Sequence, residues 1–227
     1  MRDPLWKFDS GLLGEFPVLC GVDEVGRGPL AGNVVAACVV LDFRAKPIRG
    51  LDDSKKLSPA VRGALSAEIR ERAVAYGVGE CSPDEIDRHN ILRASLLAMR
   101  RALEAMGVPP GLLLVDGNQR IPDVRWPQRT LVKGDGRSAS IAAASILAKV
   151  VRDRQMLDMH ALYPDYGFDR HKGYATLVHR RAIEKHGLTP IHRKSFCIDP
   201  REPEDLFDQD VFDPDQADPA VPGVGKP

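Results

Sequence analysis

Apolar and polar positions alternate along the first 200 residues in segments of strand and helix length. Two apolar runs come first, at residues 18–22 and 34–41, and the second is almost continuously apolar, which is typical of a strand covered on both faces. Similar runs predict further strands at residues 74–81, 112–115 and 129–133. Helical patterns predict helices at residues 58–73, 83–106, 138–162 and 177–186. Strands that come first and then alternate with helices predict an α/β fold around a mixed sheet.

Capping residues mark where three of these helices begin. Ser58 precedes Pro59, which is an N-cap followed by proline at the first helical position. Ser82 and Glu85 form a capping box, which opens a helix expected to run to about Met106. Thr176 is the predicted cap of the last helix.

The two ends of the chain lack this periodicity. Residues 1–16 are expected to form a mobile N-terminal arm, with Trp6 and Phe8 docking on the body, and residues 17–199 to form the folded domain. Beyond about residue 200 the pattern gives way to Asp, Pro and Gln, so residues 200–227 are expected to be a disordered acidic tail. Residues 201–227 contain eight acids and two bases, a net charge of −6. Since the whole chain sums to zero, residues 1–200 carry +6.

Cysteine usage and hydropathy favour a soluble cytoplasmic protein. The four cysteines are far apart and form no Cys-x-x-Cys pair, so neither a zinc site nor a disulfide framework is indicated. The longest wholly apolar run, residues 34–41, is far shorter than the roughly 20 residues that span a bilayer. Charged residues interrupt any signal-peptide core near the N-terminus. We expect a cytoplasmic monomer with no membrane association.

Residues 21–28, Gly-Val-Asp-Glu-Val-Gly-Arg-Gly, place two acids at a strand end beside a glycine-rich turn. A half-buried strand disfavours Asp and Glu, so Asp23 and Glu24 indicate a site rather than a core. Glycines let backbone N–H groups approach a ligand closely, and Arg27 offers a planar fork for phosphate. Acids for a metal beside amides for a phosphate predict chemistry on a phosphodiester. The alternative is a solvated turn with two surface acids.

Two other predicted strands also end in acid, at Asp116 and Asp135. Unit charges about 4 Å apart interact by about 1 kcal/mol in water and about 4 kcal/mol at an effective dielectric of 20, so converging carboxylates require partial protonation or divalent cations. Oxygen ligands favour magnesium or manganese over zinc. Two ions about 3.5–4 Å apart would stabilise the entering and leaving oxygens of an in-line phosphoryl displacement. Alternatively, Asp116 and Asp135 lie in ordinary Asp-Gly turns.

Six blocks of the sequence resemble, in the same order, those of bacterial ribonuclease HII. They are Gly-Val-Asp-Glu-Val-Gly-Arg-Gly-Pro-Leu-Ala-Gly (21–32), Asp-Ser-Lys-Lys-Leu (53–57), Leu-Val-Asp-Gly (114–117), Lys-Gly-Asp (133–135), Ala-Ala-Ser-Ile-Leu-Ala-Lys-Val-Val-Arg-Asp (143–153) and His-Lys-Gly-Tyr-Ala-Thr (171–176). The resemblance covers residues 18–198 and implies an RNase H-like fold: a central mixed five-stranded sheet flanked by helices, with a C-terminal helical extension that binds substrate. One departure is Asn33, where the family usually has proline, and we expect little effect on the chemistry.

The same resemblance implies a metal-dependent endonuclease. It would cleave the RNA strand of RNA–DNA hybrids and the 5′ side of single ribonucleotides embedded in duplex DNA, leaving 3′-hydroxyl and 5′-phosphate ends and initiating ribonucleotide removal. The acids that would hold two Mn²⁺ or Mg²⁺ ions are, by position, Asp23, Glu24, Asp116 and Asp135. Asp153 competes for the fourth place. Asp135 is preferred because Asp153 lies within a predicted helix, between two arginines.

Substrate contacts are implied in the same way. The resemblance assigns the backbone of Gly26, Arg27 and Gly28 to sensing the ribose 2′-hydroxyl, the group that separates RNA from DNA. It implies that Tyr174 stacks at the junction between ribonucleotide and deoxyribonucleotide, although a core tyrosine is the alternative. Lys55 and Lys56 resemble the family's phosphate contacts.

Charge and the remaining motifs suggest how a duplex and a partner would bind. Between Lys149 and Lys194 there are ten basic and five acidic residues, a net charge of +5, which predicts a salt-dependent face for a duplex backbone. A solvated helical surface is the alternative. His160 and His179 lack metal-ligand spacing and are expected to be structural. In the tail, residues 204–207 (Glu-Asp-Leu-Phe) are a candidate docking motif for the replication sliding clamp.

Two other functions remain as alternatives. A DNA nuclease or strand-transfer enzyme on the same fold would use similar acids but has no evident need for the Gly-Arg-Gly turn. A non-catalytic hybrid-binding module would have structural acids and would bind in a chelator. A dinucleotide-binding enzyme is disfavoured because the glycines do not fit Gly-x-Gly-x-x-Gly, and Pro29 follows the second glycine of the turn.

Overall fold

The computed structural model describes residues 3–196 and is built on one five-stranded sheet. Its strands, in the order β3-β2-β1-β4-β5, are β3 Ala73–Cys81, β2 Val34–Leu41, β1 Leu19–Val25, β4 Leu112–Asp116 and β5 Gln128–Leu131. β2 pairs antiparallel with both β1 and β3, whereas β1, β4 and β5 run parallel. The prediction of a mixed five-stranded sheet is therefore confirmed.

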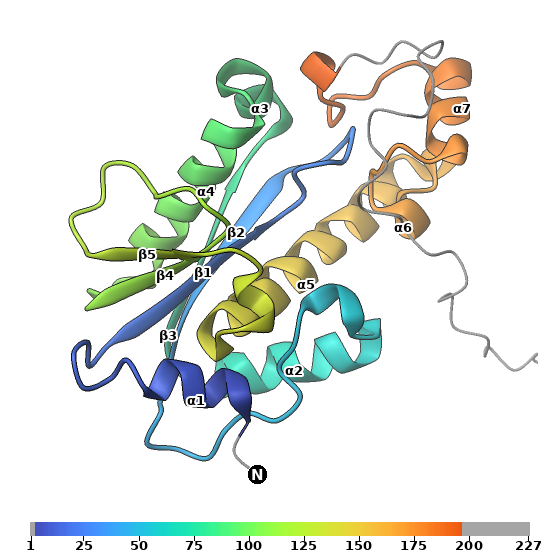
Figure 1. Ribbon diagram of the computed structural model, residues 1–227. Helices are drawn as coiled ribbons and strands as arrows, with labels where there is room; N and C mark the ends of the chain where they lie inside the picture. Colours follow the sequence, from blue (N-terminus) through green and yellow to red (C-terminus); the bar gives the residue numbers. More distant parts are fainter. Residues whose placement is uncertain (1–2, 197–227) are drawn as a thin grey trace, which may run out of the picture.

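Helices cover both faces of this sheet (Figure 1). α3 Pro83–His89 and α4 Ile91–Met106 lie on one face, and α1 Pro4–Ser10, α2 Pro59–Arg72 and α5 Ala139–Leu162 lie on the other. α6 Phe168–His171 and α7 Leu177–His186 continue beyond the end of α5 and form the expected C-terminal helical extension. Short 3-10 helices occur at η1 Ser54–Lys56, η2 Gly134–Gly136, η3 Pro164–Tyr166 and η4 Lys194–Phe196.

The apolar run of β2 is buried on both of its faces. Val35 and Val39 belong to the core beneath α5, whereas Val34 and Val40 belong to the core beneath α4. On the neighbouring strand, a Cβ added at Gly77 would lie 2.1 Å from the main-chain oxygen of Ala102, so the backbone of α4 rests directly on β3. The continuous apolar pattern therefore arises because helices cover both sides of the sheet.

One predicted helix is in fact two. The capping box of Ser82 and Glu85 is present as expected, but the helix it opens ends at His89. Asn90 has a φ of 65°, and its side chain accepts a hydrogen bond from the backbone N–H of Arg93 at the start of α4. Asparagine tolerates a positive φ better than most residues and also caps helices, so it both ends α3 and starts α4.

The N-terminal segment is a docked helix rather than a mobile arm. Trp6 is buried with its ring 4.6 Å from that of Phe43, and Phe8 packs against the core beneath β4, so the predicted docking of these two aromatics is confirmed. The buried carboxylate of Asp9 accepts a hydrogen bond from the backbone N–H of Ser140, at 2.8 Å, in the first turn of α5. Burial of one face of α1 and this bond hold the segment to the body.

Two further expectations concern compartment and the chain end. Cys20, Cys38 and Cys81 are buried free thiols. Among the helices of residues 3–196, none combines the length and apolar character needed to cross a membrane. Cys197 and the predicted acidic tail lie outside the described residues.

Candidate active site

The acids predicted from separate strands lie close together at one edge of the sheet. β1 and β4 are parallel neighbours in which Val22 pairs with Val115, so Asp23 and Asp116 are the next residues of both strands. Oδ1 of Asp116 accepts a hydrogen bond from the backbone N–H of Gly134 at 2.6 Å. This bond ties the end of β4 to η2, which carries Asp135. The topology thus brings Asp23, Asp116 and Asp135 to one place, with Glu24 beside them.

Burial and like charge raise the pKa values of three of these acids. Burial, followed by the charges of Glu24 and Asp116, raises the pKa of Asp23 well above 3.8. Burial raises the pKa of Glu24 and Asp116 adds to this, although an ion pair of 3.3 Å with Arg27 opposes both. Burial also raises the pKa of Asp135, with contributions from Asp53 and Asp116. The cluster therefore holds more negative charge than its protein surroundings neutralise.

The donor chemistry of this cluster fits hard divalent cations. All its ligating atoms would be carboxylate oxygens, which suit magnesium and manganese, and a bound cation would relieve the mutual repulsion. As the side chains stand, residues 3–196 contain no group of three or more His, Cys, Asp or Glu that could hold a metal ion. Ligation of a metal ion by the four acids is therefore a proposal.

The structure adds Asp53 to the acidic group, which the sequence reasoning did not single out. Asp53 caps η1, and its charge raises the pKa of Asp135. The hydroxyl groups of Ser54 and Ser145 lie 2.9 Å apart, and Ser145 also bonds to Asp23, so this loop is anchored beside the acids. The only signal in the sequence was that Asp53 opens the Asp-Ser-Lys-Lys-Leu block.

The two lysines of that block lie in η1, next to the acids. Lys56 forms an ion pair of 3.0 Å with Asp52. That pair raises the pKa of Lys56, and the charges of Asp53 and Asp135 add to the effect. Lys55 precedes it on the same turn, and its backbone N–H donates to Asp53. The positive charge of Lys56 therefore lies close to the acids, and Lys55 is its neighbour on the same turn.

Asp153, the competing fourth acid, is engaged in a different set of contacts. It pairs with Lys149 at 2.8 Å and with Arg62 at 3.7 Å. Its position in α5 and these pairs agree with the expectation of an ion-paired helix acid. Asp135, in contrast, interacts mainly with other acids.

The glycine-rich turn and Tyr174 come from distant parts of the chain but are neighbours. Gly26 has a φ of 93°, and a Cβ there would lie 2.3 Å from Nε of Arg152, so the turn packs directly on that side chain. A Cβ at Gly28 would lie 3.7 Å from Cε1 of Tyr174. The backbone N–H of Leu30 donates to the carbonyl oxygen of Gly173 at 2.9 Å. Tyr174 itself is half-buried, so its exposure lies between that of a core tyrosine and that of an exposed ring available for stacking.

The basic region is less exposed than its composition predicts. Arg152 and Arg193, two of the ten basic residues counted between 149 and 194, have 0% relative exposure. Their charges therefore do not lie on the surface that a duplex backbone would contact. His179 is also fully buried, stacked on His171 at 4.5 Å between ring centroids, which fits the structural role expected of it.

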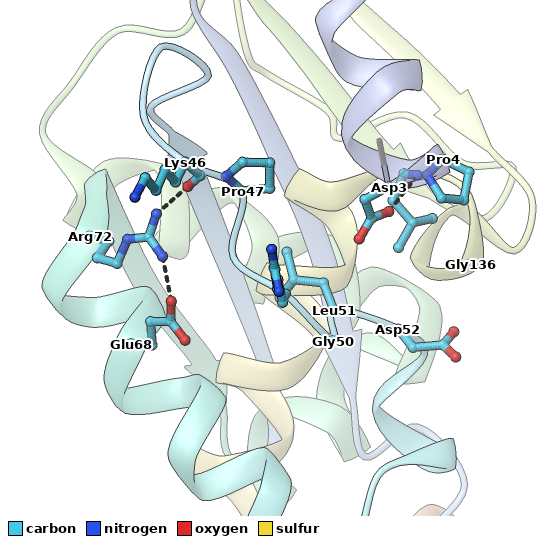
Figure 2. A pocket seen from close by; sticks show the side chains of 12 residues that line it. Asp3, Pro4, Lys46, Pro47, Gly50, Leu51, Asp52, Glu68, Arg72 and Gly136 are labelled. Carbon is cyan, nitrogen blue, oxygen red and sulfur yellow. Dashed lines mark hydrogen bonds and ion pairs between the residues drawn. The ribbon is translucent and has the colours of Figure 1, made fainter. Parts of the chain in front are cut away.

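A large hollow lies beside the acids rather than around them. It has a volume of about 1030 Å³ and lies between the start of α1, residues 46–52 and α2 (Figure 2). Asp52 and Gly136 line it, and these residues are the chain neighbours of Asp53 and Asp135. None of the four predicted metal-binding acids lines this hollow. The acids thus lie next to this hollow but do not line it.

Comparison with known proteins identifies close relatives. The family model described as Ribonuclease HII matches residues 20–198. A ribonuclease HII of Dechloromonas aromatica is 59% identical over 179 residues, covering 79% of this chain and 90% of the relative. One from Vibrio vulnificus is 56% identical over 193 residues, covering 85% and 90%.

Solved structures show the same fold. The ribonuclease H2 of Pyrococcus horikoshii OT3 superposes with a TM-score of 0.69 at 27% identity, covering 78% of this chain and 93% of that one. A ribonuclease HII of Archaeoglobus fulgidus, solved in complex with PCNA, gives a TM-score of 0.62 at 26% identity, with coverage of 78% and 93%. The Bst-RNase HIII solved with Mn²⁺ gives a TM-score of 0.66 at 20% identity, covering 80% and 67%, and shows similarity of fold alone.

Proposed function

Because the chain belongs to the ribonuclease HII family of metal-dependent nucleases, we propose that it cleaves RNA in RNA–DNA hybrids and on the 5′ side of single ribonucleotides in duplex DNA. The general family function is endonucleolytic cleavage of the RNA of hybrids. Cleavage at single ribonucleotides is supported by one observation: the acidic cluster at the ends of β1 and β4 lies beside the Gly26–Gly28 turn. Cleavage at a lone ribonucleotide would initiate its removal from DNA.

The acids would hold the metal and orient the scissile phosphate. Asp23 and Asp116 lie on adjacent strands and are proposed as shared ligands, with Glu24 and Asp135 at the two sides. Two bound divalent cations would supply electrostatic stabilisation of the entering and leaving oxygens of an in-line displacement. The hydrogen bond from Gly134 fixes one oxygen of Asp116 and leaves the other free to face a ligand. The products would carry 3′-hydroxyl and 5′-phosphate ends.

The turn and Tyr174 would provide the recognition of a ribonucleotide. The backbone of Gly26, Arg27 and Gly28 is proposed to contact the 2′-hydroxyl, and the ring of Tyr174 to stack on the next sugar or base. Their proximity supports the proposal because a single nucleotide junction could contact both. Lys55 and Lys56 would contact the backbone phosphates near the acids.

A labelled duplex bearing one ribonucleotide tests the proposal directly. The protein is incubated with magnesium, manganese or a chelator, and the products are sized to one nucleotide. Asp116→Asn should abolish cleavage while sparing folding and much of the binding, because the amide keeps the shape but loses the charge. Asp123→Asn, at an acid whose side chain is 79% exposed, is the matched control and should cleave normally. Full activity of Asp116→Asn would refute the assignment.

Two substrate comparisons separate this function from its rivals. A DNA nuclease on the same fold would cleave an all-DNA duplex of the same sequence equally well. A non-catalytic module would bind the hybrid tightly in chelator and leave the strand intact when the metal is restored.

The tail carries a separate proposal for a partner. The Archaeoglobus relative was solved in complex with PCNA, and Leu206 and Phe207 of this chain are apolar residues within an acidic segment. These two residues lie outside the described part of the chain. We propose that they dock on the replication sliding clamp. Deleting residues 201–227 should abolish binding of the clamp in a pull-down. If the deletion variant binds the clamp as well as the full chain does, this proposal is refuted.

A further inference from the structure

Two fully buried arginines lie directly behind the glycine-rich turn and donate hydrogen bonds to its main-chain carbonyls. Arg193 donates from Nε and Nη2 to Gly32 O at 3.0 and 2.7 Å, from Nη1 to Arg27 O at 3.0 Å, and from Nη2 to Gly26 O at 2.6 Å. Arg152 donates from Nε to Asn33 O and from Nη2 to Ala31 O, both at 3.1 Å. The two side chains therefore hold five carbonyls of residues 26–33 from the inside.

A buried charge without a counter-ion is costly, so this arrangement requires an explanation. Neither guanidinium is in a salt bridge with another residue of the range 3–196. Main-chain carbonyls accept the hydrogen bonds of Arg193, and the ring of Phe196 lies 5.0 Å from its guanidinium carbon. Burial lowers the pKa of Arg193 to about 9, and the nearby charge of Arg152 adds to that effect. A core that needed only packing would place apolar side chains here at lower cost.

Peptide geometry shows what the hydrogen bonds of Arg193 do to the turn. In a planar trans peptide the C=O of one residue and the N–H of the next point in opposite directions. The carbonyls of Gly26 and Arg27 point inward to Arg193, so the N–H groups of Arg27 and Gly28 point outward. Arg27 and Gly28 are exposed, and neither amide donates a hydrogen bond to another described residue.

We propose that Arg193 is a positioning residue for ribonucleotide recognition: it turns the Arg27 and Gly28 amides outward as a pair of donors for the 2′-oxygen of the substrate. This inference rests on the proposed function, which assigns the turn to the 2′-hydroxyl, and adds the group that sets its orientation. Arg193 comes from the C-terminal extension, whose backbone also bonds to the turn through Arg193 N and Leu30 O at 2.8 Å. The extension therefore shapes the recognition turn as well as carrying Tyr174.

The test measures how strongly cleavage depends on the 2′-hydroxyl. Two duplexes differ at one position, which carries either a ribonucleotide or its 2′-fluoro analogue, a poor hydrogen-bond acceptor. The sensitivity factor is the ratio of kcat/KM for the two. Arg193→Gln should reduce this factor at least about tenfold, because a misplacement of about 1 Å in a binding group costs about 100-fold. Arg193→Lys keeps the charge but lacks the planar guanidinium, so its sensitivity factor should lie between those of the wild type and Arg193→Gln.

Arg101→Gln is the matched control. Arg101 also donates to a main-chain carbonyl, Glu80 O at 2.7 Å, but lies on α4 away from the turn. It should keep the wild-type sensitivity factor even if its stability falls. A purely structural role for Arg193 would lower kcat equally on both duplexes and leave the factor unchanged, and that result overturns the inference.

The unaltered protein provides a second readout if the variants fold poorly. In metal-free buffer, the amide NMR signals of Arg27 and Gly28 should shift more with a duplex bearing a lone ribonucleotide than with the same duplex in all-DNA form. Equal shifts would overturn the inference. If the wild-type protein cleaves the ribonucleotide-bearing duplex and the all-DNA duplex alike, the proposed function is refuted, and the inference with it. If the wild type distinguishes them but the Arg193 variants keep its sensitivity factor, the inference alone is refuted.

Discussion

The buried histidines of the C-terminal extension predict that the protein loses stability in mild acid. His179 is fully buried, and its Nδ1 lies 2.8 Å from the carbonyl oxygen of Tyr174 and its Nε2 3.1 Å from Nε2 of His192. Burial lowers the pKa of His179 from 6.5 to about 3, and the neighbouring His171 and His192 add to this effect. The ring of His179 is surrounded by the imidazoles of His171 and His192 and by the ring of Phe168, while its bond to the Tyr174 carbonyl opposes the shift. No carboxylate is among the interactions that shift its pKa.

The lowered pKa of His179 determines both the direction and the size of the change in stability with pH. Below pH 6.5 the unfolded chain binds a proton at this residue that the folded protein does not, so the stabilisation is complete above pH 6.5 and is lost as the pH falls toward 3. Between pH 7 and pH 5 a single group of this kind removes about 2 kcal/mol from the free energy of unfolding. Against a typical total of about 5–15 kcal/mol, that loss is readily measured.

Urea denaturation at pH 7 and pH 5 measures this loss, and His179→Gln isolates it. The variant should lose about 2 kcal/mol less than the wild type over that interval, because its unfolded chain no longer takes up the proton of this imidazole. His186→Gln, which removes an exposed imidazole from the same helix, is the control and should behave as the wild type does. An NMR titration that finds His179 protonated near pH 6.5 in the folded protein, or equal losses in wild type and His179→Gln, would refute the reasoning.

Two other predictions concern packing and an ion pair. A Cβ at Gly21 would lie 2.0 Å from the main-chain carbon of Ser140, so Gly21→Ala should abolish the folded state by circular dichroism, whereas Gly63→Ala, in an open position on α2, should raise the free energy of unfolding by about 0.5–1 kcal/mol. Hydrogen bonds from Arg101 lower the pKa of Glu85 to about 2, so this pair stabilises the fold above pH 4.5 and is lost between pH 4.5 and 2. Glu85→Gln should cost about 1 kcal/mol at pH 7 and almost nothing at pH 2, measured by denaturant unfolding.

The sequence predicted elements well where one local signal determined the structure. The strand at 34–41 was predicted to the residue, since a run buried on both sides of a sheet leaves no polar position to blur its ends. Ser58, Ser82 and Thr176 begin their helices as predicted, because each hydroxyl accepts a hydrogen bond from a backbone N–H of the first turn. Such bonds join residues three positions apart, so they are readable from the chain.

The errors arose where contacts between distant residues decide the outcome. The helix at 83–106 breaks at Asn90, and no change in hydrophobic pattern announces the break. The segment at 4–10 is helical because Trp6 and Asp9 are buried against partners far along the chain. Arg152 and Arg193 looked like surface charges in a basic region, and only the fold shows them behind the turn.

The identity of the fourth acid illustrates how the structure sharpens a choice that the sequence left open. Asp153 neutralises Lys149, a largely buried lysine whose pKa is lowered by burial. Asp135 instead adds a negative charge beside Asp53 and Asp116, which already repel it. Asp153→Asn should therefore destabilise the protein by about 1–3 kcal/mol in urea denaturation, because it leaves a buried ammonium unpaired. Asp135→Asn should leave stability unchanged or improved, since it removes a repelling charge, and should weaken Mn²⁺ binding by calorimetry together with cleavage.

The opposite results for the two variants would exclude Asp135 as the fourth metal ligand. A stable Asp153→Asn variant that binds Mn²⁺ weakly, next to an Asp135→Asn variant with normal metal binding and cleavage, would make Asp153 the metal ligand. Its pairs with Lys149 and Arg62, which engage both carboxylate oxygens, would then have to rearrange to admit the cation. Charge balance favours Asp135, because there a cation relieves repulsion without breaking an existing ion pair.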